Sequence, residues 1–197
     1  MNNNDFQIKD NMIKEEKVIF IDRDGVINEY PGDKKYVCSL NDFRFIPGSI
    51  EGIKKLYEKG FKLYIISNQA GVAKGLYSEQ DLEKMNKKIT KELKKNGVSL
   101  SGIFYCTHHP SQDCGCRKPK TGLLDKALSQ TGAKPALTFF IGDSFKDMEA
   151  ARSFGAKPVL VLSGREKISN RKSWVFEPDY VFDNLLVAAH YICAHYG

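Results

Sequence analysis

The sequence lacks long hydrophobic runs, and no apolar stretch approaches the roughly 18 residues that a membrane-spanning helix needs. The first 17 residues are polar and charged, without the apolar core of a secretory signal. Basic residues are not gathered into a block beside aromatic residues, as a nucleic-acid surface would require. These absences predict a cytoplasmic protein that binds neither a membrane nor a nucleic acid.

The residues that are present are typical of a globular protein. The chain has 197 residues, of which 42% are hydrophobic and 27% are charged, and no internal repeat is evident. We expect residues 17–197 to form a single domain that acts as a monomer, and residues 1–16 to form a flexible leader. The net charge of +6 comes from scattered lysines, so a small anionic substrate and plain solubility explain it equally well.

One hydrophobic segment ends in two carboxylates. Residues 18–21 read Val-Ile-Phe-Ile, which predicts a buried strand, and Asp22, Arg23, Asp24 and Gly25 follow. Asp22 and Asp24 are two residues apart, so they point the same way on an extended backbone. One interpretation is a strand that ends in a solvated turn. The other is an active site just past the strand end, where open α/β sheets bind ligands.

A pair of carboxylates at such a position has a definite chemistry. The two charges repel each other unless a cation or a proton lies between them. Mg²⁺ fits, since it is usually held by one or two carboxylates and a substrate phosphate. One carboxylate can attack phosphorus, and its neighbour can act as general acid and base. The pair therefore indicates Mg²⁺-dependent phosphoryl transfer.

Strands and helices alternate along the chain, which predicts a mainly parallel sheet with helices on both faces. Such a sheet would bring further polar residues to the edge that holds the two carboxylates. Ser67 and Asn68 end the second strand and suit phosphate oxygens, although an ordinary strand-to-helix turn would look the same. Asp143 follows the fourth strand and could complete an acidic metal site. Asp147 is either a group that supports the direct ligands of that site from behind or a helix-start acid favoured by the helix dipole.

Three of the five cysteines lie within eleven residues, together with histidine. The pattern Cys-x-His-x5-Cys-x-Cys predicts a closed, structural zinc site with four ligands: Cys106, His108, Cys114 and Cys116. His109 is an alternative nitrogen ligand, and buried or oxidised thiols are an alternative to zinc. Arg117 and Lys118 follow directly and would supply positive charge to a phosphoryl group, unless they belong to an ordinary basic loop.

Together these residues resemble the four motifs of the haloacid-dehalogenase-like (HAD) phosphatase superfamily. The motifs occur in the expected order as Asp22-Arg23-Asp24-Gly25, Ser67-Asn68, Lys118, and Gly142-Asp143 with Asp147. The resemblance covers about residues 17–165 and implies a Rossmann-like three-layer α/β sandwich. The stretch from Ser67 to Gly75 and the Cys/His loop are most similar to the branch that contains heptose-bisphosphate phosphatases and histidinol-phosphate phosphatases.

The resemblance also implies a role for each residue. Asp22 would be the nucleophile, and Asp24 would protonate the leaving oxygen and then activate water. Mg²⁺ would be bound by Asp22, by the backbone carbonyl of Asp24 and by Asp143. The transferring phosphoryl group would be held by three side chains: Ser67, Asn68 and Lys118. Arg117 would reach a second phosphate or a sugar hydroxyl.

Too few residues separate the motifs for a cap domain, so the segment Asn28–Asn41 and the Cys/His loop should roof the site. The implied activity is Mg²⁺-dependent hydrolysis of a sugar phosphate through an aspartyl-phosphate, with a heptose 1,7-bisphosphate preferred and histidinol phosphate as the alternative. A polynucleotide-end phosphatase would need a basic groove, which the dispersed lysines do not suggest. A non-catalytic zinc-stabilised binding module would have lost at least one catalytic residue, but all of them are present.

Overall fold

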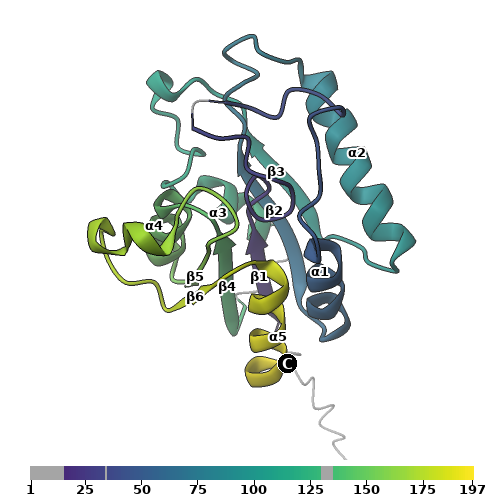
Figure 1. Ribbon diagram of the computed structural model, residues 1–197, viewed down its shortest axis with the longest axis vertical. Helices are drawn as coiled ribbons and strands as arrows, with labels where there is room; N and C mark the ends of the chain where they lie inside the picture. The colour runs from purple at the N-terminus through teal and green to yellow at the C-terminus, as the bar shows by residue number, and fades with distance from the viewer. Residues whose placement is uncertain (1–15, 34, 130–134) are drawn as a thin grey trace, which may run out of the picture.

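A computed structural model describes residues 16–33, 35–129 and 135–197, and every structural statement below concerns these residues (Figure 1). They contain a parallel sheet of six strands: β1 (Lys17–Ile21), β2 (Lys62–Asn68), β3 (Gly102–Cys106), β4 (Leu137–Gly142), β5 (Lys157–Val161) and β6 (Tyr180–Phe182). The α-helices are α1 (Ser49–Glu58), α2 (Glu79–Lys95), α3 (Gly122–Ser129), α4 (Phe145–Phe154) and α5 (Leu185–Tyr196). Two short 3-10 helices are η1 (Pro110–Gln112) and η2 (Ile168–Ser173). The expected leader lies almost wholly outside the described residues.

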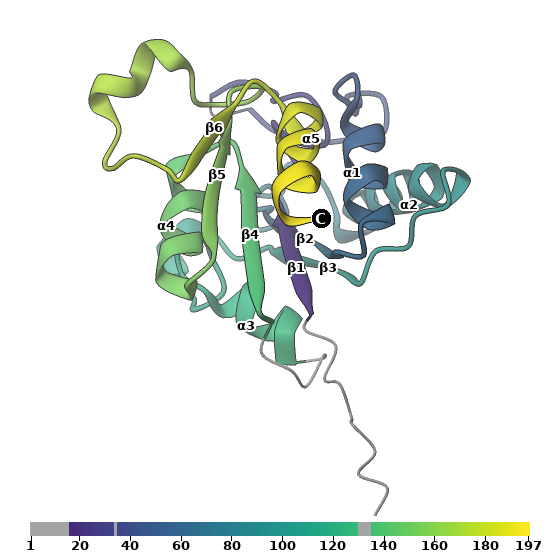
Figure 2. The same ribbon diagram turned by 90° about the horizontal axis from the view of Figure 1, so that it is seen from below.

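The sheet is the middle of three layers, as the sequence predicted. Figure 2 shows α1, α2 and α5 on one side of the sheet and α3 and α4 on the other. The strand order is β3-β2-β1-β4-β5-β6, and each neighbouring pair is parallel. The chain steps from β1 to β2 on one side and later to β4 on the other. A sheet of this order binds ligands where the direction of winding reverses, outside the carboxyl end of β1.

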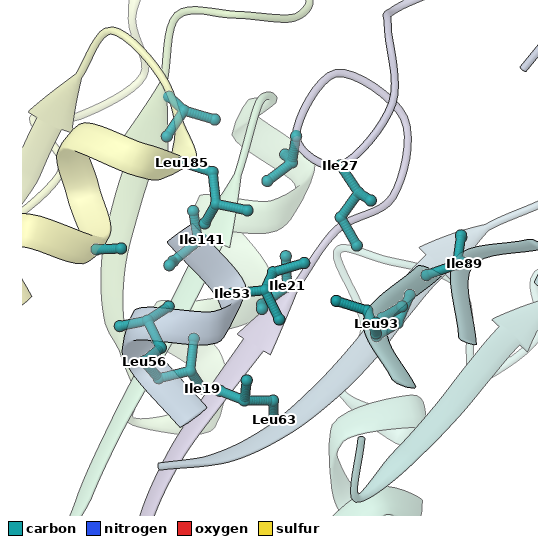
Figure 3. Packing of buried hydrophobic residues seen from close by; sticks show 14 of the residues in the cluster. Ile19, Ile21, Ile27, Ile53, Leu56, Leu63, Ile89, Leu93, Ile141 and Leu185 are labelled. Atoms are coloured by element: carbon teal, nitrogen blue, oxygen red, sulfur yellow. The ribbon is translucent and has the colours of Figure 1, made fainter. Parts of the chain in front are cut away.

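After Lys17, the central strand β1 is apolar at every position because both of its faces are covered. Ile19 and Ile21 pack in the cluster under α1, α2 and α5, and Figure 3 shows them beside Ile53 and Leu56 of α1. Val18 and Phe20 point the other way, into the cluster under α3 and α4. These four side chains are fully buried, whereas Lys17, at the start of β1, is half-buried. A continuous apolar run is what a doubly covered parallel strand requires.

Polar residues set where two of the helices begin. The Ser78 hydroxyl accepts a hydrogen bond from the Asp81 backbone N–H at 3.1 Å, and the Asp81 carboxylate accepts one from the Ser78 backbone, which forms a capping box before α2. At α4, the Asp147 carboxylate accepts hydrogen bonds from the backbone N–H and the hydroxyl of Ser144. The predicted helix-start role of Asp147 is therefore confirmed, and it directs this carboxylate toward the carboxyl end of β4.

The strand register aligns the ends of β1, β2 and β4. Ile21 lies opposite Ile65 on one side and Ile141 on the other, and the Asp22 N–H continues the ladder to the Ile141 carbonyl at 2.9 Å. Polar residues that follow these strands therefore meet at one edge of the sheet. Among the described residues, none of the helices has the length and apolar character needed to cross a bilayer.

Candidate active site

A pocket of about 350 Å³ lies over the carboxyl ends of the central strands. Its walls contain all the catalytic and phosphate-binding residues expected from the sequence: Asp22, Asp24, Ser67, Asn68, Arg117, Lys118 and Asp143. Asp147 lines the same pocket. Residues up to 143 positions apart along the chain, from Asp22 to Arg165, thus line one pocket.

Three carboxylates and one lysine form the buried floor of the pocket. Carboxylate oxygens of Asp22, Asp143 and Asp147 lie within 4.8 Å of one another. Lys118, which is only 2% exposed, places Nζ 3.0 Å from Asp22 Oδ1 and 2.5 Å from Asp147 Oδ1. The same Nζ donates to the Ile66 carbonyl at 2.9 Å. Asp147 is therefore also a member of the acidic cluster, and its expected role behind the direct metal ligands stays a prediction.

The electrostatics of this floor favour a divalent cation. Burial, together with the charge of Asp147, raises the pKa of Asp22 to about 6, although Lys118 and the Ser67 hydroxyl act in the opposite direction. Burial and the charges of Asp22 and Asp147 also raise the pKa of Asp143 well above its usual range. A single lysine does not balance three carboxylates. Oxygen ligands with excess negative charge are the donor set that Mg²⁺ prefers, so the residues present fit this ion.

Two glycines leave room for Asp143. A Cβ atom on Gly25 would lie 2.1 Å from Asp143 Oδ2, and one on Gly164 would lie 2.0 Å from the same atom. Gly25 also has a φ of +83°, which disfavours side chains at this position. The Asp143 carboxylate additionally accepts a hydrogen bond from the Arg165 backbone N–H at 2.7 Å. Backbone on two sides thus fixes this carboxylate in place.

The Asp24 carboxylate lines the pocket but does not belong to the acidic cluster. The Arg23 guanidinium donates to both of its oxygens at 2.9–3.1 Å. Asn28 donates to Oδ1 and Gln69 donates to Oδ2, each at 2.9 Å. The side chain nevertheless remains 22% exposed, so one side of the carboxylate stays open to the pocket. The expected contribution of Asp24 to metal binding, through its backbone carbonyl, stays a prediction.

Ser67 and Asn68 contact different parts of the site. The Ser67 hydroxyl is 2% exposed and hydrogen-bonds Asp22. The Asn68 amide exchanges two hydrogen bonds of 3.1 Å with the backbone N–H and carbonyl of Lys118. In this arrangement Asn68 fixes the backbone that carries Lys118, and its expected direct contact with a phosphoryl group stays a prediction.

The predicted cysteine and histidine ligands also come together. One ligand atom from each of Cys106, His108, Cys114 and Cys116 lies within 4.8 Å of the others. Cys114 Sγ is 3.5 Å from the sulfur atoms of both Cys106 and Cys116, and His108 Nδ1 is 3.2 Å from Cys116 Sγ. Zn–S bonds of about 2.3 Å place tetrahedral sulfur ligands about 3.8 Å apart, so these residues fit zinc. The His109 ring instead hydrogen-bonds Ser111 at the start of η1.

Loops cover the pocket, and some residues of the pocket wall were not predicted from the sequence. Tyr30 and Lys35 come from the expected segment Asn28–Asn41, but Lys146 and Arg165 come from α4 and from the loop after β5. No local pattern distinguishes these two cations from other surface residues. Gln69 was part of the strand-end turn, yet only the structure shows its contact with Asp24.

Known proteins share these features. Residues 115–188 match the family described as HAD-hydrolase-like. The D-glycero-beta-D-manno-heptose-1,7-bisphosphate 7-phosphatase of Haemophilus ducreyi is 38% identical over 157 residues, which cover 76% of this chain and 85% of that protein. The enzyme of the same name from Pseudomonas putida is 37% identical, over 88% of this chain and 97% of that protein. The chain belongs to the HAD-like heptose-bisphosphate phosphatase family.

A solved structure of this family has the same fold. The D,D-heptose 1,7-bisphosphate phosphatase from B. bronchiseptica, crystallised with magnesium and phosphate, superposes with a TM-score of 0.83 at 29% sequence identity. The match covers 90% of this chain and 98% of that chain. The protein is therefore a phosphatase of the HAD type, an enzyme class that uses Mg²⁺, and the predicted fold, family and enzyme class are confirmed.

Proposed function

We propose that the chain hydrolyses the 7-phosphate of a D-glycero-D-manno-heptose 1,7-bisphosphate with the help of Mg²⁺. The names of its relatives support this substrate class. The observation that carries the choice of a bisphosphate is the number of cations around the pocket: Lys35, Lys74, Arg117, Lys118, Lys146 and Arg165.

The charges of the pocket leave a positive surplus after its acids are balanced. Arg23 neutralises Asp24, and Lys118 with one divalent cation would balance the three clustered carboxylates. Of the five remaining cations, Arg165 is paired with Asp33 at 3.2 Å. The other four cations are Lys35, Lys74, Arg117 and Lys146. Their summed positive charge matches two phosphate groups, each of charge up to about −2 at neutral pH. Histidinol phosphate, with one phosphate and a positively charged amine, would leave this surplus unmatched.

Lys146 interacts with two other cations of the pocket. Burial and the charges of Arg117 and Arg165 lower the pKa of Lys146, so each of these two arginines repels the Lys146 ammonium. An Arg117 nitrogen is buried without a hydrogen-bond partner. A second phosphate placed here would relieve the repulsion and satisfy this donor.

The reaction would proceed in two steps on the floor of the pocket. An Asp22 carboxylate oxygen attacks phosphorus and the bond to the sugar oxygen breaks, while Asp24 gives its proton to that oxygen. Water then attacks the aspartyl-phosphate, gives its proton to Asp24, and phosphate leaves as the bond to Asp22 breaks. Lys118 and Ser67 hold the phosphoryl oxygens. Mg²⁺ at Asp22 and Asp143 would supply the positive charge that this transfer needs.

We propose that zinc occupies the cysteine and histidine cluster, because its four ligand atoms have the separation of a closed tetrahedral site. Arg117 and Lys118 follow Cys116 directly, so the ion would hold the loop that positions both cations. The five cysteines are unpaired, which supports action in the reducing cytoplasm. We also propose that the protein acts as a monomer.

The test compares phosphate release from heptose 1,7-bisphosphate, heptose 7-phosphate and histidinol phosphate. We expect the highest kcat/KM for the bisphosphate, with cleavage at position 7. Arg117→Met and Lys146→Met should raise KM for the bisphosphate at least about tenfold and change KM for the monophosphate much less. Lys172→Met, at an exposed position of η2, is the control. A preference for histidinol phosphate would overturn the substrate proposal and leave the catalytic assignments unchanged.

A further inference from the structure

The carboxylate of Asp24 lies at one end of a short chain of polar side chains. Gln69 Nε2 donates to Asp24 Oδ2 at 2.9 Å, and Tyr77 donates its hydroxyl proton to Gln69 Oε1 at 2.6 Å. A carboxylate only accepts hydrogen bonds, and a phenol that donates to Oε1 turns the other end of the amide away from itself. Tyr77 therefore fixes which end of Gln69 faces Asp24.

This chain of side chains is rigid. Gln69 is 1% exposed and Tyr77 is 7% exposed. The Tyr77 ring packs against the turn after β2 so closely that a Cβ atom on Gly71 would lie 2.1 Å from the ring. Neither side chain has room to adopt another rotamer without disturbing this turn.

Gln69 also connects the two proposed catalytic carboxylates. Its Nε2 donates a second hydrogen bond to Ser67 Oγ at 3.1 Å, and the Ser67 hydroxyl in turn bonds Asp22. The charge of Asp24 is already balanced by Arg23. The uncharged amide of Gln69 therefore contributes to the orientation of the Asp24 carboxylate and not to its charge balance. Gln69 thus connects Asp24, through Ser67, to Asp22.

We propose that Gln69, oriented by Tyr77, is a positioning residue that holds Asp24 where it can exchange a proton with the leaving oxygen and with the attacking water. This inference rests on the proposed function, in which Asp24 is the general acid and base. The effect of Gln69 and Tyr77 should therefore be larger on the proton-transfer steps than on the attack of Asp22 on phosphorus.

A substrate with a good leaving group separates these steps. The nitrophenolate of p-nitrophenyl phosphate leaves without a proton, so its release reports the attack of Asp22 alone. Phosphate release in the same reaction needs Asp24 to activate water. A sugar oxygen needs the proton in the first step as well. Both products of p-nitrophenyl phosphate can be followed in a single turnover by rapid quench, with enzyme in excess.

We expect Tyr77→Phe to keep nitrophenolate release within about twofold of the wild-type rate. Gln69→Leu also removes the contact with Ser67, so it should slow nitrophenolate release as well, but less than it slows phosphate release. Phosphate release should slow about tenfold or more in both variants, because small misplacements of a catalytic group can lower rates up to about a hundredfold. Turnover of the heptose bisphosphate should fall at least as much. The control is Tyr180→Phe, which removes an equally short hydroxyl contact, to Tyr196, at the β6 edge of the sheet.

Two results would overturn the inference. Equal slowing of nitrophenolate and phosphate release would indicate a general disturbance of the site, and unchanged rates in both variants would show that Gln69 and Tyr77 do not act. A wild-type enzyme that cleaves p-nitrophenyl phosphate but no heptose bisphosphate would overturn the substrate proposal alone, since the nitrophenyl reaction still tests the inference. A wild-type enzyme without phosphatase activity would overturn both.

Discussion

Replacing Lys118 by methionine tests the most concentrated set of charges in the protein. Lys118 Nζ lies between Asp22 and Asp147 and also donates to the Ile66 carbonyl, and its side chain is 2% exposed. Methionine fills a similar volume without the charge or the three donors. The change therefore leaves the three clustered carboxylates with no buried lysine among them.

The expected loss of stability in Lys118→Met follows from these contacts. Breaking one side of a buried ion pair costs about 3–5 kcal/mol, because the remaining charge keeps its desolvation penalty. For a chain of this size, about 1 kcal/mol corresponds to a shift of about 2–4 °C in Tm. We expect Lys118→Met to lower the free energy of unfolding by about 3–5 kcal/mol in Mg²⁺-free buffer and to lower Tm by about 10 °C. Added Mg²⁺ should restore part of the loss by balancing the carboxylates.

The assay is urea unfolding at pH 7 without a chelator, so that any zinc at the cysteine cluster stays in place. Lys120→Met is the matched control, since Lys120 belongs to the same loop and pairs with Asp113 at 2.6 Å, but on the surface. Its loss should change stability by less than about 1 kcal/mol. If both variants lost the same stability, the buried cluster would not depend on Lys118 and the reasoning would be refuted. A second check is turnover, which should be lost in Lys118→Met only.

Four further predictions concern the same site. Asp22→Asn should abolish turnover and keep the wild-type fold, as followed by circular dichroism, and wild-type-like phosphate release would exclude Asp22 as the nucleophile. Metal analysis of protein purified under reducing conditions should give one zinc per chain, and Cys116→Ser should lower both this content and activity; zinc-free but fully active protein would contradict the structural role of the ion. Gly164→Ala should raise the Mg²⁺ concentration needed for half-maximal activity, because its Cβ would lie 2.0 Å from Asp143 Oδ2. Gly115→Ala, whose Cβ meets nothing within 4 Å, should leave that concentration unchanged. In Mg²⁺-free protein, the pKa of Asp22 rises from 3.8 to about 6 on folding, so the folded chain holds this proton more tightly and stability should fall as the pH rises from about 4 to about 6. The Asp22→Asn variant should lack this part of the slope, and identical pH profiles for the two proteins would count against it.

Much of the fold and most of the site followed from short patterns. The run Val18–Ile21 is apolar at every position because helices cover both of its faces, and this pattern predicted the central strand. The polar residues after β1, β2 and β4 meet because parallel strands place their carboxyl ends at one edge. The Cys106–Cys116 pattern predicted its cluster because the ligands are close in sequence as well as in space.

Other parts of the site depend on contacts between distant segments. Gln69 reaches Asp24 across 45 positions, and Arg165 reaches Tyr30 across 135. Neither Lys146 nor Arg165 differs in local pattern from the lysines and arginines of the surface. Their place at the pocket is visible only once the loop after β5 and the start of α4 are packed beside β1.

The sequence by itself determined the alternation of strands and helices, the strand-end carboxylates and the local metal-ligand pattern, since each depends on residues within a few positions of one another. Only the tertiary structure decided that Asp147 joins Asp22 and Asp143, that the Asp24 carboxylate faces Arg23 and Gln69, and that spare cations gather around the pocket. The physical reason is the distance along the chain over which each property is determined. Local backbone geometry follows from neighbouring residues, whereas burial, hydrogen-bond partners and the balance of charge depend on every segment that packs around a group.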